Sequence, residues 1–382
     1  MNVWLKVKNL GPIEEFDGDI KDLTIVVGPN NSGKTFFSIS FFLLTTLGAP
    51  FPYEGVKVHL KNGEVTINED LTDVTSKILK ALITSYFGID EVKKLISWGE
   101  KESDIIFNNL SIKIYEDNTV KVEHPSEQKP KVKFKRVEGI TSPMYNFVGD
   151  DVIETVSPTD EVDVELPLYV FYYDLVKEYF PSVYLPAERV TLATFTEPLL
   201  NYITNPLYLP PFVKPIIHNF LFVLAQEVNS QVLDNFSFSY NSKTKRVGYS
   251  YNGKRVPLVS TGTSQVAYIE LSGGNEDIKS MVIEEPEINL HANAQVKMAK
   301  YLLSLLGKKR LFITTHSEII PIIIAREATK RGLKEKVSIY EMRESNKGRY
   351  KNVKINIYDD GTTDVLKTTS EEVFNALEEY IS

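Results

Sequence analysis

Residues 28–35, with the sequence GPNNSGKT, constrain this chain more than any other stretch. They fit the pattern G-x-x-x-x-G-K-[ST] in the required context, after an apolar β-branched run at 23–27 and before an apolar helical pattern at 36–47. Glycines let backbone N–H groups turn toward phosphate oxygens, and a helix N-terminus adds its positive dipole end. The stretch therefore predicts a nucleoside triphosphate site rather than a chance glycine-rich turn.

Each residue of this loop has an expected part in binding ATP. Lys34 would reach the β- and γ-phosphates, and the Thr35 hydroxyl would coordinate Mg²⁺. The predicted nucleotide-binding set is Gly28, Pro29, Asn30, Asn31, Ser32, Gly33, Lys34 and Thr35.

Composition narrows the class of protein. The 382 residues carry a formal net charge of −8, which argues against coating nucleic acid by bulk electrostatics but leaves room for a local basic groove. The absence of cysteine excludes disulfides, thiolate metal sites and a cysteine nucleophile. No signal-peptide pattern opens the chain, and the apolar runs are too short to span a bilayer, so we expect a soluble cytoplasmic protein without a membrane partner.

The first half of the chain predicts an antiparallel sheet and an insertion. Strands are expected at 4–8 and 13–20, ahead of the phosphate loop. Within 51–181 we expect hairpins turning at Asn62-Gly63 and Asp117-Asn118, and a helix over 70–98. The stretch 127–165 is charged and poorly periodic, so we expect it to be mobile. The basic run 129–136 alternates like a solvated edge strand, although it could also contact phosphate backbones.

The second half predicts an α/β sheet. A strand at 182–185, a helix at 215–233 and three short strands at 236–240, 246–251 and 254–258 come first. Helices and strands then alternate to a final helix that begins at the capping box 369–372. This rhythm indicates a mainly parallel sheet with helices on its faces. The predicted division is an ATPase domain from 1–50 and 182–382, with an inserted α+β region at 51–181.

Two strands end in side chains that suit phosphoryl chemistry. The apolar strand at 280–283 ends in Glu284 and Glu285, for which we expect a metal ligand and the residue that orients the attacking water. The strand at 311–315 ends in His316, at the edge where such sheets bind ligands, and this histidine could donate to the γ-phosphate. The bland alternatives are solvated acids and a structural histidine, and the phosphate loop favours the functional interpretation.

Two stretches resemble the signature loop of ABC-type ATPases, which contacts nucleotide and precedes a helix. Residues 271–274 spell Leu-Ser-Gly-Gly, but only five residues separate Asn275 from Met281, too few for the helix that must lead into the acidic strand. Residues 259–265 are less literal, and a helix can follow them. We therefore assign Ser260 and Gly262 to the signature.

Together these motifs resemble the ABC/SMC-like ATPase heads of the RecF and OLD (overcoming lysogenization defect) type. The resemblance covers roughly 1–47 and 182–382, and it is carried by the stretches 8–13, 28–35, 184–189, 260–265, 284–291 and 314–317. It implies an ABC-type P-loop head that closes as an ATP-sandwich homodimer, with Ser260 and Gly262 of one copy over the γ-phosphate held by Lys34 of the other. Residues 287–291 would resemble the D-loop, and His316 the switch histidine.

This chain departs from the family pattern in three ways. Glu284 stands where most such heads have aspartate, and only Gln226 and Gln231 remain as candidates for the Q-loop glutamine. The stretch after His316 is too short for the Toprim nuclease domain of OLD nucleases. Asp359-Asp360-Gly361 is expected to be a turn rather than a metal site.

Three functions follow from this resemblance. The first is an ATPase switch that dimerises on ATP and acts with a partner nuclease or toxin in genome defence or DNA repair. The second is an ATP-gated clamp or sensor on DNA, suggested by the basic residues of 129–136 and 243–246. The third, the ATPase subunit of a transporter, fits the large insertion and the weak Q-loop least well.

Overall fold

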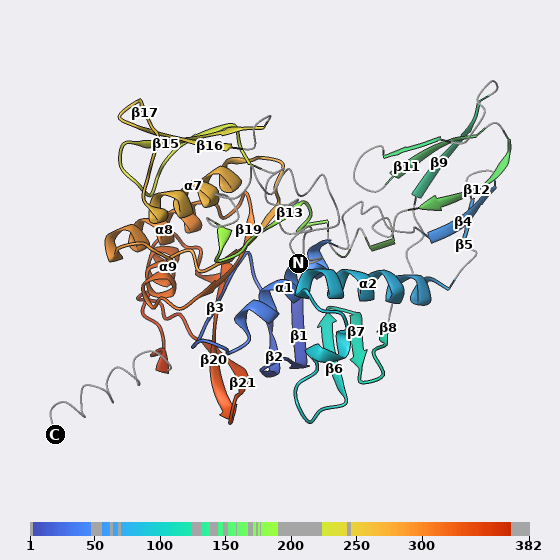
Figure 1. Ribbon diagram of the computed structural model, residues 1–382, viewed down its shortest axis with the longest axis horizontal. Coiled ribbons are helices and arrows are strands. Elements are labelled where there is room, and N and C mark those ends of the chain that lie inside the picture. Colours follow the sequence, from blue (N-terminus) through green and yellow to red (C-terminus); the bar gives the residue numbers. More distant parts are fainter. Residues whose placement is uncertain are drawn as a thin grey trace.

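The computed structural model describes residues 3–46, 56–61, 64–67, 70–123, 131–137, 144–147, 152–157, 159–166, 171–172, 175, 177–189, 224–242 and 246–367. In these ranges the chain forms one large mixed sheet, three small sheets and helices on both faces of the large sheet (Figure 1). No helix within them is long and apolar enough to cross a membrane. The predicted final helix and the first part of the predicted helix at 215–233 lie outside the described residues.

Half of the large sheet is parallel, as the alternation of helices and strands predicts. Five adjacent strands run in the same direction: β13 (Ser182–Leu185), β18 (Ser280–Glu284), β19 (Arg310–Thr315), β3 (Leu23–Val27) and β20 (Val337–Asn346). Because the strands are parallel, the loops after β3, β18 and β19 lie at one edge of the sheet. Those loops carry the predicted phosphate loop, the acidic pair and the histidine.

The other half of the sheet is largely antiparallel. Beyond β20 the strand order is β21 (Arg349–Ile355), β2 (Ile13–Ile20), β1 (Val3–Leu10), β6 (Glu102–Phe107), β7 (Leu110–Tyr115) and β8 (Val120–Glu123). The predicted N-terminal antiparallel sheet is therefore present, and it continues into strands of the predicted insertion. The domain boundaries themselves stay a prediction, to which the topology adds that β6 to β8 extend the large sheet.

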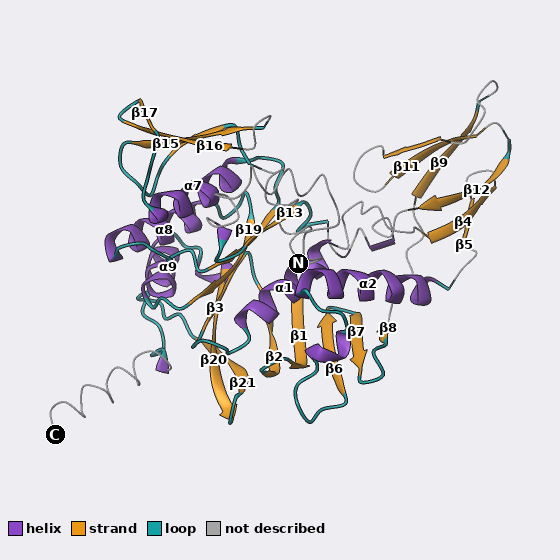
Figure 2. Cartoon of the chain, in the orientation of Figure 1, coloured by secondary structure: helices purple, strands orange, loops and turns teal. Residues whose placement is uncertain are grey.

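Helices cover the two faces of the sheet (Figure 2). One core contains α1 (Lys34–Thr46) and α2 (Leu71–Phe87), and the other contains α7 (Thr261–Gly274), α8 (Ala292–Ser304) and α9 (Ile319–Lys330). Side chains alternate between the two cores along each strand: Val282 and Phe312 face the α1 side, whereas Ile283 and Ile313 face the α7 side. This double burial explains why the central residues of β18 and β19 are apolar on both faces.

Three smaller sheets complete the described structure. Their strand orders are β10 (Met144–Phe147), β11 (Val152–Ser157) and β9 (Lys131–Arg136); β12 (Glu161–Leu166), β4 (Val56–Lys61) and β5 (Glu64–Ile67); and β14 (Glu227–Asn229), β15 (Phe236–Asn241), β16 (Arg246–Tyr251) and β17 (Lys254–Val256). The hairpins predicted around 62–63 and 117–118 are confirmed by the β4–β5 and β7–β8 pairings. The basic strand β9 lies at a sheet edge, as predicted.

Two expectations about this region are wrong. The helix predicted over 70–98 ends at Phe87, because Gly88 adopts φ +65° and its N–H bonds the Thr84 carbonyl; a short 3₁₀ turn, η1 (Val92–Leu95), follows. The predicted helix to residue 233 is a strand at Glu227–Asn229 in its described part, paired with β15. The described part of the stretch 127–165 forms strands β9 to β12: β9, β10 and β11 pair among themselves, and β12 pairs with the distant β4. The mobility expected for this stretch stays a prediction.

Candidate functional site

The phosphate loop lies between β3 and α1, as predicted, and its glycines are required by close neighbours. Gly33 has φ +91°, and a Cβ atom added to it would lie 2.4 Å from Cγ1 of Ile13. A Cβ atom on Gly28 would lie 2.9 Å from Cβ of Met342, on the neighbouring strand β20. A side chain at either position would clash, so the sequence of the loop is fixed by packing as well as by ligand approach.

Lys34 lies across this loop. Its Nζ donates hydrogen bonds to the carbonyls of Gly28 at 2.9 Å and Pro29 at 2.7 Å. Burial lowers the pKa of Lys34 to about 8, against the opposing charges of Glu285, Glu287 and Glu284. A phosphate group would replace these two carbonyls as the acceptor for the amine and would stabilise the charged form that burial disfavours.

A hydroxyl inside the loop also lacks a partner. The Ser32 Oγ atom is buried and makes no hydrogen bond, and an unmade buried hydrogen bond is costly. The hydroxyl is therefore a free donor, and the Lys34 amine can exchange its carbonyl acceptors for phosphate oxygens, which bind in such loops. The loop therefore fits a triphosphate.

The predicted metal ligands, Thr35 and Glu284, are brought together. Glu284 is 4% exposed at the end of β18, and its Oε1 accepts a 2.7 Å hydrogen bond from Ser38 of α1. Burial raises the pKa of Glu284, and hydrogen bonds from Ser38, Tyr184 and Thr35 oppose this effect. A hydroxyl and a carboxylate beside phosphates suit Mg²⁺, which keeps most of its ligands as water and phosphate oxygens. The described residues contain no cluster of three or more histidine or acidic side chains that would form an all-protein metal cage.

The predicted catalytic pair, Glu285 and His316, is also brought together. The Glu285 N–H donates to the Thr314 carbonyl at 2.8 Å, and this bond links the ends of β18 and β19. His316 Nε2 lies 3.4 Å from Oε1 of Glu285. Hydrogen bonding and charge from His316 lower the pKa of Glu285, aided by the charges of Lys34 and Arg189 and opposed by burial. Glu285 is thus held as the carboxylate that a general base requires.

Glu285 adopts an unusual backbone conformation, with φ +45°. Non-glycine residues rarely occupy this region, and the strain costs on the order of 1–3 kcal/mol. Surrounding hydrogen bonds must therefore hold the residue in place.

Arg189 provides much of that restraint, and the sequence assigned it no role. Its side chain is fully buried, and it donates to three backbone carbonyls: Pro186 at 3.0 Å, Glu284 at 2.7 Å and Glu285 at 3.0 Å. Burial lowers the pKa of Arg189 to about 10, so the guanidinium remains charged at neutral pH. The motif at 184–189 contained the residue, but its carbonyl partners leave no signal in a sequence.

Glu287 restrains the opposite side of the pair. Its Oε1 accepts hydrogen bonds from the backbone N–H groups of His316 at 2.8 Å and Ser317 at 3.2 Å. Gln295 adds a second link, because it donates to the Leu290 carbonyl at 2.9 Å and accepts from the Ser317 hydroxyl at 2.7 Å. The loop that resembles a D-loop thus holds the backbone that presents His316.

Helix α7 carries the two competing signature stretches at its opposite ends. The helix begins at Thr261, with Ser260 as its N-cap, and ends at Gly274. Leu271-Ser272-Gly273-Gly274 is therefore the end of this helix, whereas Ser260 and Gly262 are at its beginning, as our assignment requires. Ser260 is exposed and its hydroxyl bonds within its own first turn, to Thr263.

Gly262 packs against the neighbouring loop. A Cβ atom on it would lie 2.4 Å from the carbonyl oxygen of Asn289, which itself has φ +59°. The predicted contact of Ser260 and Gly262 with nucleotide stays a prediction.

The remaining candidates lie elsewhere. The described hydrogen bonds of Gln226 and Gln231 link them to Tyr240 and Glu270, away from the phosphate loop. His291 is the N-cap of α8, without a side-chain capping bond. Asp360 accepts hydrogen bonds from the N–H and hydroxyl of Thr362, which confirms the predicted turn at 359–361.

Comparison with known proteins gives a partial match. Residues 213–320 match the family model described as the AAA ATPase domain. No curated protein matches the chain.

Solved structures of SMC heads share the arrangement loosely. The Smc head bound to the C-winged helix domain of ScpA aligns over 93% of this chain and 98% of its own, at 11% identity and a TM-score of 0.47. The Smc head with an extended coiled coil, bound to the C-terminal domain of ScpA from Pyrococcus furiosus, covers 99% of both chains at 11% identity and a TM-score of 0.45. The SMC head domain from Thermotoga maritima covers 94% and 100% at 10% identity and a TM-score of 0.40. None of these likenesses assigns an activity.

Proposed function

We propose that this chain binds and hydrolyses ATP. The observation that carries the proposal is the Glu285–His316 pair, which lies beside the buried Lys34 of a phosphate loop. The negative charges of Glu285 and Glu284 act on the Lys34 amine. The match of residues 213–320 to the AAA ATPase domain supports it. These residues have the roles that phosphoryl transfer to water requires.

Each residue has a definite part in the proposed reaction. Lys34 and the loop N–H groups bind the phosphates. Thr35 and Glu284 would hold Mg²⁺, which would supply positive charge to offset the negative charge of the phosphates. Glu285, kept ionised by His316, orients the attacking water and accepts its proton. His316 donates a hydrogen bond from its ring toward the γ-phosphate. Arg189 and Glu287 bond the backbones of Glu285 and His316 and so fix the positions of these two residues.

We further propose that the site is completed by a second copy of the chain. Ser260 is exposed at the N-terminus of α7, and its described hydrogen bonds stay within its own helix. Hydroxyl and backbone groups at a helix N-terminus suit a γ-phosphate. If Ser260 acts on the nucleotide of a partner copy, ATP binding and dimerisation become one linked equilibrium. Hydrolysis would then release the dimer, as befits a switch that acts with a partner nuclease or toxin in genome defence or DNA repair.

Solution mass tests this proposal. Glu285→Gln should keep ATP binding and stop hydrolysis, so its mass measured by light scattering should double with ATP and Mg²⁺ and return when ATP is removed. Adding Ser260→Arg should abolish the doubling, whereas Thr261→Ala, at the neighbouring exposed position, should not. A mass that stays constant while ATP binds would exclude dimerisation of the isolated chain. Absence of hydrolysis in the unmodified protein would exclude the proposed ATPase activity.

A DNA clamp is the second candidate, favoured by strand β9. This edge strand exposes Lys133, Lys135 and Arg136, and Arg136 pairs with Asp160 at 3.0 Å. Binding of duplex DNA that requires ATP, weakens steeply with salt and is lost in Lys133→Glu/Lys135→Glu would favour it. Binding that does not depend on ATP or on these lysines would exclude it.

A further inference from the structure

The edge of the parallel sheet opposite the phosphate loop carries a cluster of basic residues. A hollow of about 460 Å³ at this edge is lined by six basic side chains (Lys177, Lys279, Lys308, Lys309, Arg310 and Lys336) and by the carboxylates of Asp22 and Glu178. Lys279 precedes β18, Arg310 opens β19, Asp22 precedes β3 and Lys336 precedes β20. The amino ends of four adjacent strands thus bring together charges that are far apart in the sequence.

The two carboxylates are already paired with other residues. Arg310 bonds Asp22 at 2.8 Å and also pairs with Glu178, and Lys336 lies 3.6 Å from Asp22. Lys309 is buried and donates to the carbonyls of Asn275 and Ile278. Both carboxylates that line this hollow, Asp22 and Glu178, are therefore paired with basic side chains.

Two lysines remain without a carboxylate in the part of the chain that the structure describes. Among the described residues Lys308 forms no ion pair, and Lys279 makes only a 3.4 Å hydrogen bond to the Lys177 carbonyl. In a chain whose net charge is −8, this is a local excess of positive charge. Its field attracts an anionic partner at short range, whereas the rest of the molecule repels a long polyanion.

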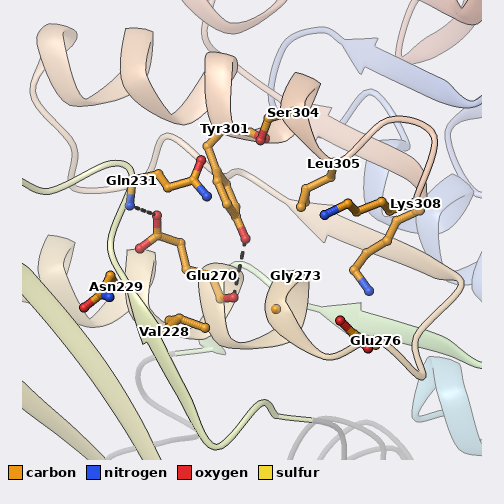
Figure 3. Close-up of a pocket in the computed structure, with 12 residues that line it drawn as sticks. Val228, Asn229, Gln231, Glu270, Gly273, Glu276, Tyr301, Ser304, Leu305 and Lys308 are labelled. Atoms are coloured by element: carbon orange, nitrogen blue, oxygen red, sulfur yellow. Dashed lines mark hydrogen bonds between the residues drawn. The ribbon is translucent and has the colours of Figure 1, made fainter.

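A second hollow adjoins the first and indicates the kind of partner. It has a volume of about 580 Å³ and shares Lys308 and Lys309 with the basic hollow. Val228, Tyr301 and Leu305 line its apolar part, and the carboxylates of Glu270 and Glu276 also line it (Figure 3). Figure 3 also shows the polar groups of Asn229 and Gln231 around the same space. A polypeptide can place acidic side chains in one hollow and an apolar side chain in the other, whereas a phosphodiester backbone has no apolar side chains.

We propose that the two hollows, joined at Lys308 and Lys309, are a docking site for an acidic segment of a partner protein that also carries an apolar residue. The site lies at the opposite edge of the sheet from the phosphate loop, so nucleotide bound at that loop leaves it open. The same elements connect the two ends: β18 leads to Glu284, β19 to His316, and α7 begins at Ser260. A partner bound here contacts the amino ends of β18 and β19 and the last residues of α7.

Peptide binding to the nucleotide-free protein tests this proposal separately from ATP hydrolysis. The probe is a short fluorescein-labelled peptide of glutamate with leucine, and binding is followed by fluorescence anisotropy. We expect saturable binding that weakens with salt and falls about tenfold or more in Lys279→Glu/Lys308→Glu. Lys101→Glu/Lys347→Glu, which changes the net charge equally at exposed positions elsewhere, should bind as the unmodified protein does. Lys308→Ala alone should show a smaller loss, and it keeps the test valid if the double variant does not fold.

Four results would overturn the proposal. The first is absence of peptide binding by the unmodified protein. The second is an equal loss in the control variant, which would show that net charge alone is responsible. The third is tighter binding of single-stranded DNA of matched charge that depends on the same two lysines. The fourth is a peptide affinity that is unchanged when leucine is replaced by serine. Either of the last two would remove the argument for a polypeptide.

Discussion

Arg189 holds the backbone of Glu285: the buried guanidinium donates a 3.0 Å hydrogen bond to the Glu285 carbonyl, and a 2.7 Å bond to the preceding carbonyl of Glu284. Glu285 has φ +45°, which few side chains other than glycine and asparagine adopt readily. The charged side chain therefore serves as a rigid support for a strained residue, although it forms no carboxylate pair within hydrogen-bond distance among the described residues. Its position explains how the carboxylate of Glu285 stays directed at His316.

Replacing Arg189 should impair turnover more than nucleotide binding. A lysine side chain at this position has one ammonium group and cannot reach three carbonyls, so we expect Arg189→Lys to lower kcat for ATP about 10²-fold, as small displacements of catalytic groups do. The Kd for ATP should change by less than about threefold, because Lys34 and the loop remain. Arg189→Met should additionally lower the free energy of unfolding by about 3–5 kcal/mol, since buried carbonyls lose their partner.

Steady-state kinetics, ATP titration and urea unfolding give these three values. Arg331→Lys, an exposed arginine at the end of α9, is the matched control and should behave as the unmodified protein. A full kcat in Arg189→Lys would show that the strained backbone needs no such support.

Glu287 should act through the position of His316. Glu287→Ala removes the acceptor for the N–H groups of His316 and Ser317, each of which then loses a hydrogen bond worth about 1–3 kcal/mol when buried. We expect kcat to fall about 10–100-fold with little change in the Kd for ATP. Glu287→Gln retains an oxygen that can accept the same bonds, so it should recover most of the activity, and equal loss in both variants would assign the effect to charge instead.

A methyl group at Gly262 should disturb the contact between α7 and the loop at 286–290. The added Cβ atom would lie 2.4 Å from the Asn289 carbonyl oxygen, so one of the two segments must move. We expect Gly262→Ala to lower the free energy of unfolding by about 1–3 kcal/mol and to weaken the ATP-dependent doubling of mass in Glu285→Gln. Thr261→Ala changes the adjacent exposed residue and should alter neither measurement; an unaffected Gly262→Ala would show that the two segments separate freely.

The parts of the site that follow local rules could be predicted from the sequence. The phosphate loop, the acidic strand end and His316 each depend on a short strand and the turn after it, and parallel strands bring such ends together. The choice of Ser260 over the literal match at 271–274 followed from the length a helix needs, and α7 confirms that placement. Arg189 could not be assigned, because its partners are backbone carbonyls, which every residue has.

The errors in the fold have a related cause. Strand β12 was missed although its residues alternate, because it pairs with β4, across about one hundred residues, and no local pattern encodes that pairing. Gly88 marked the end of α2, but the apolar residues after it, up to Ile96, continued a helical spacing and concealed the stop. Local chemistry thus fixes the site better than it fixes the sheets around it.

The last prediction concerns the pH dependence of stability at Glu270. This residue is 2% exposed on α7, its Oε1 accepts from the N–H groups of Gln231 and Val232, and its Oε2 has no hydrogen-bond partner. Burial raises the pKa of Glu270, and hydrogen bonds from Ser230, Gln231 and Val232 act against this shift. The charged groups of Lys308, Lys309 and Glu276 line the same hollow.

The sign follows from the direction of this shift. A folded-state pKa above the unfolded value means that the folded protein binds the proton more tightly, so stability falls as pH rises from the unfolded pKa, near 4.5, through the folded pKa. Glu270→Gln has no proton to release, so its free energy of unfolding, relative to that of the unmodified protein, should increase over this window and level off above it. Urea unfolding at a series of pH values measures the difference. Glu318→Gln, which is outside this hollow, should show no such rise. If the free energy of unfolding of Glu270→Gln relative to the unmodified protein stays flat or falls with pH, the two backbone hydrogen bonds of Glu270 outweigh the cost of burying its charge.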